Sequence, residues 1–355
     1  MVIFLAIVHA ALFLTLLGNV FYLRRTRRQA TASDVPLVSI LIPARNEAAN
    51  LRRLLPSLQA QDYPAFEVLL YDDESEDETW AVIQAAEDPR IRGVKSQGPP
   101  PPGWIGKVHA LYQVTKHARG CLYFFLDADS ELLDPGALRR IIERYLALPD
   151  DAVLTGMTLL RGGGQMLVSL VPNALLTGLP WPLVRRFRAR SLGALNGQFW
   201  MIDADHYRRL DPFVHVKNEV LEDVQLGRYF KMQGLTPYLC DVTREMAVYM
   251  YRNHADAWRG FRKNAYLILG GQPLSFVLLF VLFFFTYVLA PFYSPWFLVS
   301  IYVLKASTDR LARFPFWVSL LAPISYLLSP FLQLDSAFNH WTGRVSWKGR
   351  RVGGA

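Results

Sequence analysis

The chain has 355 residues, of which 52% are hydrophobic, and its 38 Lys and Arg against 30 Asp and Glu give a net charge of +8. This length exceeds one average domain, and the hydrophobic content is too high for a wholly soluble protein. The positive charge favours contact with anionic lipid, whereas the absence of interleaved basic and aromatic residues argues against nucleic acid as a partner. The two cysteines, Cys121 and Cys240, lack zinc-site spacing and fit a reducing compartment.

The amino-terminal residues 1–23 predict a membrane anchor. They include no Asp, Glu, Lys or Arg and are long enough to cross a hydrocarbon core of about 30 Å as a helix. Arginines crowd residues 24–28, so the positive-inside rule places the amino terminus outside and the following chain in the cytoplasm. A cleaved signal peptide is the alternative, but its basic residues would precede the apolar stretch. We expect a retained anchor over 1–23 and a basic linker over 24–35.

Between residues 36 and 271, short apolar runs alternate with helical patterns. Continuous apolar runs are typical of strands buried on both faces, and they cover 37–42, 66–71, 121–126 and 152–155. Helical patterns lie between or after these runs, over 47–58, 77–86, 107–117 and 135–146. Such repetition predicts an α/β fold with a mostly parallel, doubly wound sheet, which binds ligands at the carboxyl ends of its strands.

Polar clusters follow three of the predicted strands. Pro43-Ala44-Arg45-Asn46-Glu47 follows the first, Asp72-Asp73 the second and Asp127-Ala128-Asp129 the third. A helix cap at Asn46 or a solvated acidic turn would explain any one of them alone. Three clusters at one edge of a sheet predict a shared ligand site, and carboxylates there suit Mg²⁺ or Mn²⁺ bound together with a diphosphate.

A further acidic pair, Glu222-Asp223, stands about ninety residues later at the head of an amphipathic helix. A carboxylate set apart from the metal-binding pair can accept the proton of an acceptor hydroxyl. The alternative interpretation is a helix cap, because acidic residues are favoured in the first turn of any helix.

In this order and spacing, the motifs resemble the family 2 glycosyltransferases with the GT-A fold, a Rossmann-like α/β domain. The resemblance covers roughly residues 38–263 and is closest to membrane-bound enzymes that glycosylate lipids, including carotenoid, hopanoid-associated and ceramide glycosyltransferases. Gly103-Trp104-Ile105-Gly106-Lys107, followed by Ala110-Leu111, supports that subgroup. The resemblance implies an inverting hexosyltransferase that moves a sugar from a nucleotide-diphosphate sugar, expected to be UDP-linked, to a hydroxyl or carboxylate of a membrane lipid, with Mn²⁺ or Mg²⁺ as cofactor.

The resemblance also implies a role for each matching residue. Asp223 would be the general base of a single inverting displacement, with Glu222 supporting it, and Asp129 would bind the metal. The donor would be held by Ala44, Arg45 and Glu47 at the base and ribose, Asp72 and Asp73 at the uracil edge, Lys107 at the diphosphate or sugar, and Asp127 at the ribose or sugar.

One segment departs from the family pattern. Where family members bind the leaving diphosphate with Q/R-x-x-R-W, this chain has Arg259-Gly260-Phe261-Arg262-Lys263. Both arginines are present and remain candidates for a diphosphate clamp, although a basic cluster beside the next span is an equally plain explanation. The missing tryptophan weakens the case for a processive polysaccharide synthase.

From residue 272 onward the chain is again apolar. Residues 274–292 and 316–334 are each long enough to cross a membrane, whereas 296–304 is short and suits a re-entrant or interfacial piece. We expect a cytoplasmic GT-A domain over 36–271, transmembrane and interfacial helices over 272–340, and a basic cytoplasmic tail over 341–355. The chain would then be a multi-pass protein of the inner or plasma membrane.

Three alternatives stay open. A processive polysaccharide synthase would need more spans to form a channel, and a non-catalytic nucleotide-sugar-binding membrane protein would have no need of Asp223. The third concerns the apolar stretch 166–184, which is either a buried core helix or an interfacial helix that admits a lipid acceptor. Four basic residues directly follow that stretch, namely Arg185, Arg186, Arg188 and Arg190.

Overall fold

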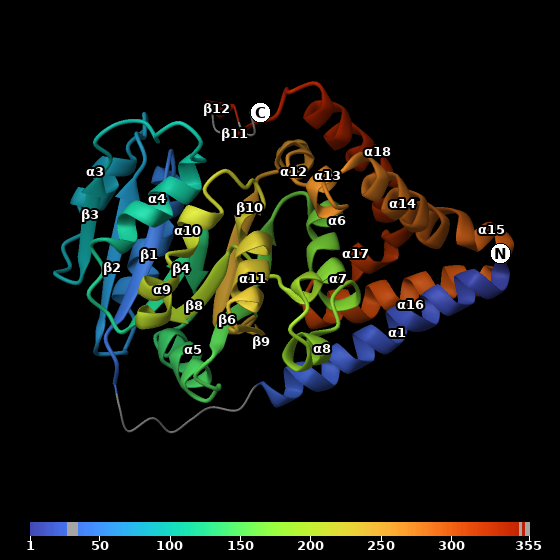
Figure 1. Ribbon diagram of the computed structural model, residues 1–355, viewed down its shortest axis with the longest axis horizontal. Helices are drawn as coiled ribbons and strands as arrows, with labels where there is room; N and C mark the ends of the chain where they lie inside the picture. Colours follow the sequence, from blue (N-terminus) through green and yellow to red (C-terminus); the bar gives the residue numbers. More distant parts are fainter. Residues whose placement is uncertain (27–34, 348–349, 352–355) are drawn as a thin grey trace. The chain divides into compact units, whose positions relative to one another are not determined.

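The computed structural model describes residues 1–26, 35–347 and 350–351, with side chains up to residue 345 (Figure 1). The predicted linker at 24–35 therefore lies largely, and the basic tail at 341–355 partly, outside the described residues. The chain forms two compact units. The α/β unit contains Leu23–Leu159 and Leu183–Val248, and the helical unit contains Met1–Tyr22, Leu160–Pro182 and Tyr249–Ala355.

The α/β unit is built on a seven-stranded sheet of order β3-β2-β1-β4-β8-β6-β9. Neighbours among β3, β2, β1 and β4 are parallel, β8 is antiparallel to β4 and β6, and β6 is parallel to β9. The mostly parallel sheet and the four strands predicted from apolar runs are confirmed. The strands are β1 (Val38–Ala44), β2 (Phe66–Asp72), β3 (Ile91–Lys95), β4 (Leu122–Leu126), β6 (Ala152–Met157), β8 (Phe199–Asp203) and β9 (Thr236–Asp241).

Helices cover this sheet and confirm the four predicted between the strands. Their apolar residues recur every three or four positions, as in α2, where Leu51, Leu54, Leu55 and Leu58 are buried. Stacked rings fill part of the core, and the ring centroids of Phe125 in β4 and Trp200 in β8 are 3.9 Å apart. The helices are α2 (Ala48–Gln59), α3 (Thr79–Gln84), α4 (Gly106–Thr115), α5 (Ala137–Leu146), α9 (Ala204–Leu210), α10 (Pro212–His215) and α11 (Glu222–Met232), with a 3-10 turn η1 at Arg190–Leu192.

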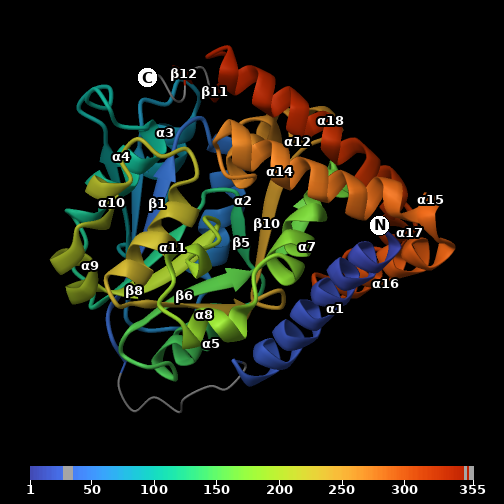
Figure 2. The ribbon, with the colours of Figure 1, turned by 45° about the vertical axis from the view of Figure 1, so that its right-hand side comes forward.

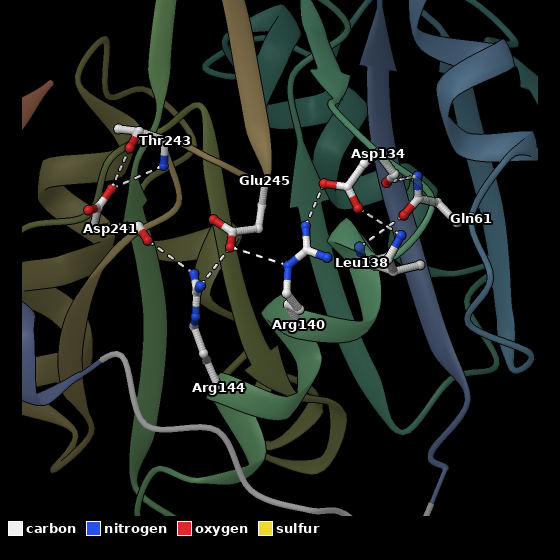
Figure 3. A network of polar contacts seen from close by, with 9 residues as sticks. Gln61, Asp134, Leu138, Arg140, Arg144, Asp241, Thr243 and Glu245 are labelled. Carbon is white, nitrogen blue, oxygen red and sulfur yellow. Dashed lines mark hydrogen bonds and ion pairs between the residues drawn. The ribbon is translucent and has the colours of Figure 1, made fainter. Parts of the chain in front are cut away.

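A partly buried ion-pair network ties α5 to the turn that follows β9 (Figure 3). Arg144 and Arg140 both contact Glu245, at 2.6 and 3.4 Å, and Arg140 also contacts Asp134 at 2.6 Å. The backbone carbonyl of Glu245 accepts a hydrogen bond from the N–H of Leu133 at 2.9 Å. Strand β5 (Ser130–Leu132) ends beside the network and strand β10 (Met246–Tyr251) begins there, and the two strands pair antiparallel. The network therefore fixes the strand that directly follows the Asp127–Asp129 motif.

The helical unit contains two helices that are long and apolar enough to cross a membrane, Val2–Arg25 and Pro273–Tyr293. Only 22% and 17% of their most apolar windows are buried, so neither resembles the core helix of a soluble protein. The second is a continuous run of α14 (Pro273–Phe284), a π-helical turn η2 (Phe285–Leu289) and α15 (Ala290–Tyr293). Helix α8 (Trp181–Arg186) begins in this unit and continues into the α/β unit. The other elements are β7 (Leu159–Gly162), α6 (Gln165–Val168), α7 (Leu170–Thr177), α12 (His254–Arg262), α13 (Ala265–Ile268), α16 (Pro295–Leu311), α17 (Phe316–Leu320), α18 (Ala322–Trp341), β11 (Ser346–Trp347) and β12 (Arg350–Arg351).

Two predicted helices are divided in the structure. The predicted span 316–334 is broken at Leu321 between α17 and α18, where Pro323 suits a new helix start because proline lacks the N–H that would go unpaired there. Helix α18 also buries Ser325, Ser329 and Gln333, so its composition is too polar for the simple apolar span that we predicted. The apolar stretch 166–184 is likewise divided among α6, α7 and α8.

Polar side chains fix α1 within the helical unit. Asn19 is fully buried and donates hydrogen bonds to the carbonyls of Leu176 and Leu179, each at 2.8 Å. Its side-chain oxygen accepts from the N–H of Trp181, also at 2.8 Å. His9 bonds to the hydroxyl of Ser300 in α16 at 2.6 Å, and both ribbon views show α1 lying along α16 (Figures 1 and 2). The amino-terminal helix is thus a packed element of this unit.

Candidate active site

A single lysine joins two carboxylates at the end of β4. Lys107 lies in the first turn of α4, and its Nζ is 2.9 Å from Asp127 Oδ1 and 3.0 Å from Glu222 Oε1. The three side chains are 35%, 26% and 13% exposed, respectively, so the cluster is largely shielded from solvent yet open on one side. Three predicted site residues from three separate segments of the chain therefore meet at one point.

The charge on Lys107 depends on these two neighbours. Burial disfavours the ammonium form, but Asp127 and Glu222 outweigh that effect and raise the pKa of Lys107 well above its ordinary value. The lysine therefore stays protonated at neutral pH. It compensates the charge of Glu222 and leaves the adjacent carboxylate without a cationic partner of its own.

That adjacent carboxylate is Asp223, in the first turn of α11. Its Oδ2 accepts a hydrogen bond from the N–H of Gly197 at 2.9 Å, and its Oδ1 accepts from the N–H of Val224 at 2.8 Å. Burial, together with the nearby charge of Glu222, raises the pKa of Asp223 to about 6, against the lowering effects of Lys107 and the two N–H donors. At neutral pH the group is mostly ionised and accepts a proton more readily than an ordinary aspartate. The cap position of α11 is Leu221, and Asp223 lies in the first turn that follows it, where the alternative interpretation also expects acidic residues.

The loop Asn196-Gly197-Gln198 contacts both Asp127 and Asp223. Our sequence analysis did not identify this loop. A Cβ atom on Gly197 would lie only 2.9 Å from Asp223 Oδ2 and 3.1 Å from its Cβ, so the loop approaches the carboxylate as closely as glycine permits. The backbone carbonyl of Gln198 accepts from the N–H of Asp127 at 3.2 Å. Asn196 is itself held by a bond to the carbonyl of Gly156 at 2.8 Å. The only sequence signal was Asn-Gly, which marks turns in general.

The ends of β1 and β2 form a second polar layer. The N–H of Asp73 donates to the carbonyl of Ala44 at 2.8 Å, and the Arg45 guanidinium donates to the carbonyl of Asp73 at 2.6 Å. Asn46 adopts a left-handed backbone with φ 53°, and its side chain accepts from the N–H of Glu76 at 2.8 Å instead of capping α2. The structure thus brings the first two predicted motifs together.

Two further residues that we predicted to bind the nucleotide sugar, Asp72 and Glu47, each have a hydrogen-bond partner of their own. Asp72 is 1% exposed, and one of its oxygens accepts from the N–H of Ser75 at 3.2 Å. Glu47 accepts from the side-chain amide of Asn50 at 2.6 Å. Its charge also acts on Asp127, which places the first motif within electrostatic range of the β4 end.

Asp129 lies half-buried between β4 and β5. Among the residues that the structure describes, no group of three or more His, Cys, Asp and Glu side chains is arranged to hold a metal ion. Asp127, the other carboxylate of the motif, is paired with Lys107. One protein carboxylate suits Mg²⁺ or Mn²⁺ whose other ligands are phosphate oxygens and water, and it does not suit a closed structural metal site.

The predicted diphosphate clamp belongs to the helical unit. Arg259 and Arg262 lie in the last turns of α12, where Arg259 forms an ion pair with Asp256. Phe261, between them, packs edge-on against Tyr251, with ring centroids 5.2 Å apart. The role of the two arginines stays a prediction.

Comparison with known proteins identifies one segment of the chain. Residues 39–206 match the family described as glycosyl transferase family 2. This segment is therefore a family 2 glycosyltransferase domain. Two relatives are named 4,4'-diaponeurosporenoate glycosyltransferase. The one from Staphylococcus haemolyticus (strain JCSC1435) is 33% identical over 151 residues, covering 39% of this chain and 38% of the relative. The one from Staphylococcus aureus (strain MRSA252) is 34% identical over 108 residues, covering 30% and 28%. The matches thus span well under half of each relative.

A solved structure supports the fold of the family 2 domain. The mannosyltransferase from Pyrobaculum calidifontis, in complex with GDP-Man and Mn²⁺, covers 99% of this chain and 100% of its own, with a TM-score of 0.58 and 18% sequence identity. At that identity the likeness concerns the fold alone. The predicted α/β GT-A-like architecture and the family resemblance are confirmed.

The close approach of Gly197 to Asp223 is testable by substitution. Gly197→Ala should lower the free energy of unfolding by about 1–3 kcal/mol, because the added methyl group displaces the carboxylate and breaks its bond to the 197 N–H. The measurement is thermal and denaturant unfolding of the full chain in detergent micelles. Gly18→Ala is the matched control, since its added Cβ meets nothing nearer than 3.7 Å. Equal effects of the two substitutions would contradict the contact.

Proposed function

We propose that this protein is an inverting glycosyltransferase of a bacterial-type cell membrane, which transfers a hexose from a nucleotide-diphosphate sugar, expected to be UDP-linked, to a membrane lipid. The observation that carries the proposal is Asp223, a shielded carboxylate with a pKa of about 6 beside the Lys107 cluster of a family 2 domain. A group with that pKa is suited to accept a proton at neutral pH. The relatives named 4,4'-diaponeurosporenoate glycosyltransferase support a lipid acceptor.

The proposed reaction is one displacement at the anomeric carbon. The acceptor oxygen forms a bond to that carbon while the bond to the leaving diphosphate breaks on the opposite face, so the configuration inverts. Asp223 takes the proton of an attacking hydroxyl in the same step. A carboxylate acceptor would already be ionised at neutral pH and would need no base. The raised pKa of Asp223 therefore favours a hydroxyl as the acceptor over a carboxylate.

The donor would lie along the carboxyl ends of β1, β2 and β4. We assign the base and ribose to Ala44, Arg45 and Glu47, the uracil edge to Asp72 and Asp73, and the sugar side to Asp127 and Lys107. Support comes from the two polar layers at these strand ends, which lie where doubly wound sheets bind ligands. Arg259 and Arg262 remain our candidates for the departing diphosphate.

A divalent cation fits this arrangement with Asp129 as its protein ligand. When bound, Mn²⁺ or Mg²⁺ would neutralise charge on the leaving diphosphate. Asp127 stays with Lys107, which orients it toward the donor.

The membrane part of the proposal is a multi-pass chain with a cytoplasmic catalytic domain over residues 36–271. The helices Val2–Arg25 and Pro273–Tyr293 are its best candidates for spans. Arg24 and Arg25, at the end of the first helix, favour the cytoplasmic side for the chain that follows. Lipid-facing helices would place the catalytic domain next to a lipid acceptor.

The central substitution is Asp223→Asn. It preserves shape and should bind donor normally, but it cannot accept a proton, so turnover with a hydroxyl acceptor should fall at least about a hundredfold. Labelled nucleotide sugars supplied to membranes, followed by lipid extraction, give the rate, and NMR of the product gives its anomeric configuration. Near wild-type turnover, or a product that retains the donor configuration, would remove Asp223 from the role of base.

A second substitution tests the metal. Asp129→Ala should weaken donor binding at least about tenfold in the presence of Mn²⁺ and leave metal-free binding nearly unchanged, since one charge-assisted ligand is lost. Titration calorimetry with and without Mn²⁺ measures both. Asp205→Ala is the matched control, because Asp203-Ala204-Asp205 repeats the D-x-D pattern and Asp205 is 89% exposed. Unchanged Mn²⁺-dependent affinity in Asp129→Ala would rule out this ligand.

A further inference from the structure

A pocket of about 520 Å³ lies in the α/β unit where the first apolar helix ends. Arg25, the last residue of α1, and Thr26 form one side of it. Arg185 of α8 and Tyr238 of β9 form another, and the apolar turn 147–149 completes the lining. None of these residues contributes to the Lys107 cluster or to the polar layer of β1 and β2. The pocket is therefore separate from the candidate active site.

Two arginines give this pocket a net positive charge, with the carboxylate of Asp151 acting on Tyr238 from nearby. The Arg185 guanidinium lies over the Tyr238 ring, with its Cζ 5.1 Å from the ring centroid, which holds it at the pocket wall. Within the described parts of the chain, neither Arg25 nor Arg185 has a carboxylate at ion-pair distance, unlike Arg140 and Arg144 in the partly buried network. A guanidinium forms paired hydrogen bonds with phosphate oxygens, so two of them facing one pocket suit a phosphate group.

The surroundings of the pocket have the composition of a membrane interface. Leu183 and Phe187 are large apolar residues that are 43% and 51% exposed. They alternate with the exposed arginines that follow the apolar stretch 166–184, namely Arg185, Arg186, Arg188 and Arg190. Exposed apolar side chains among arginines are typical of segments that lie in the headgroup region of an anionic bilayer.

Side-chain contacts hold the start of α8 beside the carboxyl-terminal end of α1. Asn19 bonds to the backbone on both sides of residue 180, and the rings of Tyr22 and Trp181 stack with centroids 6.4 Å apart. Both ribbon views show α8 next to the last turns of α1 (Figures 1 and 2). If α1 crosses the bilayer, as the proposed function requires, the pocket lies at the depth of the lipid headgroups.

We propose that this pocket binds the phosphate of an anionic phospholipid such as phosphatidylglycerol. Arg25 and Arg185 bind the phosphate oxygens, and the apolar turn 147–149 contacts the glycerol and the first acyl carbons. The lipid anchors the α/β unit to the cytoplasmic leaflet, independently of donor and acceptor. A soluble phosphate would satisfy the arginines equally, but it would not use the exposed Leu183 and Phe187 beside them.

The test uses the full chain in detergent micelles that contain increasing fractions of phosphatidylglycerol or phosphatidylcholine, with thermal unfolding as the readout. Phosphatidylglycerol should raise the midpoint in a saturable way, and phosphatidylcholine should not. Arg25→Gln and Arg185→Gln should each increase the half-saturating fraction about fivefold. Arg209→Gln on α9 removes the same charge from an exposed site away from the pocket, and it should behave as the wild type.

Three results would overturn the proposal. An equal increase of the half-saturating fraction in Arg209→Gln would mean that lipid binding depends on the overall charge of the protein and not on the pocket. A full shift with millimolar inorganic phosphate alone would assign the pocket to a soluble anion. No difference between the two lipids in the wild type would exclude a headgroup site. Unfolding midpoints in phosphatidylcholine micelles show whether each variant is folded, and resistance of the chain to alkaline washing of membranes tests the insertion of α1 separately.

Discussion

One ammonium group sets the chemistry of this molecule. Lys107 sits between Asp127 at the end of β4 and Glu222 at the head of α11, about 3 Å from each. Without that charge, two shielded carboxylates would face each other across the site and repel. With it, the strand that would bind the donor and the helix that would bear the base are held in a fixed relation. The β-sheet, α4 and α11 all contribute to this one contact.

The same ion pair distinguishes Glu222 from Asp223. Glu222 is paired directly with the lysine, whereas Asp223 accepts hydrogen bonds from the backbone N–H groups of Gly197 and Val224 and interacts with the Lys107 charge without an ion-pair contact. Two neutral donors compensate a buried charge less fully than a cation does, so the pKa of Asp223 stays raised. A carboxylate that is costly to keep ionised is a better proton acceptor. The function that we propose thus follows from an incomplete compensation of charge.

The sequence predicted this architecture well where the pattern was local. Continuous apolar runs marked β1, β2, β4 and β6, and the polar residues just after them marked the ligand-binding edge of the sheet. What could not be predicted depends on contacts between distant segments. Lys107 was assigned to the diphosphate or sugar, yet its two carboxylate partners are twenty and more than a hundred residues away. The loop at Gly197 gave no signal beyond a turn, because only its approach to Asp223 makes that glycine necessary.

The membrane part was the hardest to predict. Hydropathy marked α1 correctly as an apolar helix, but the polar residues that fix it, Asn19 and His9, acquire meaning only through their partners in α7, α8 and α16. In α18 the exposed face is apolar, whereas the buried face includes polar residues. Leu327 and Phe331 are about half exposed, while Ser325 and Ser329 are buried. A sequence window averages over both faces, so it could not tell a simple span from this arrangement.

The most direct test of the central claim is the pH dependence of stability. Because burial raises the pKa of Asp223 from 3.8 to about 6, the stability contributed by its protonated form is complete below pH 3.8 and is lost as the pH rises through 6. Asp223→Asn does not titrate. Between pH 4 and pH 8 the wild type should therefore lose up to about 3 kcal/mol of unfolding free energy relative to this variant. A difference between the two proteins that stays constant across that range would show that Asp223 has an ordinary pKa, and it would contradict the account.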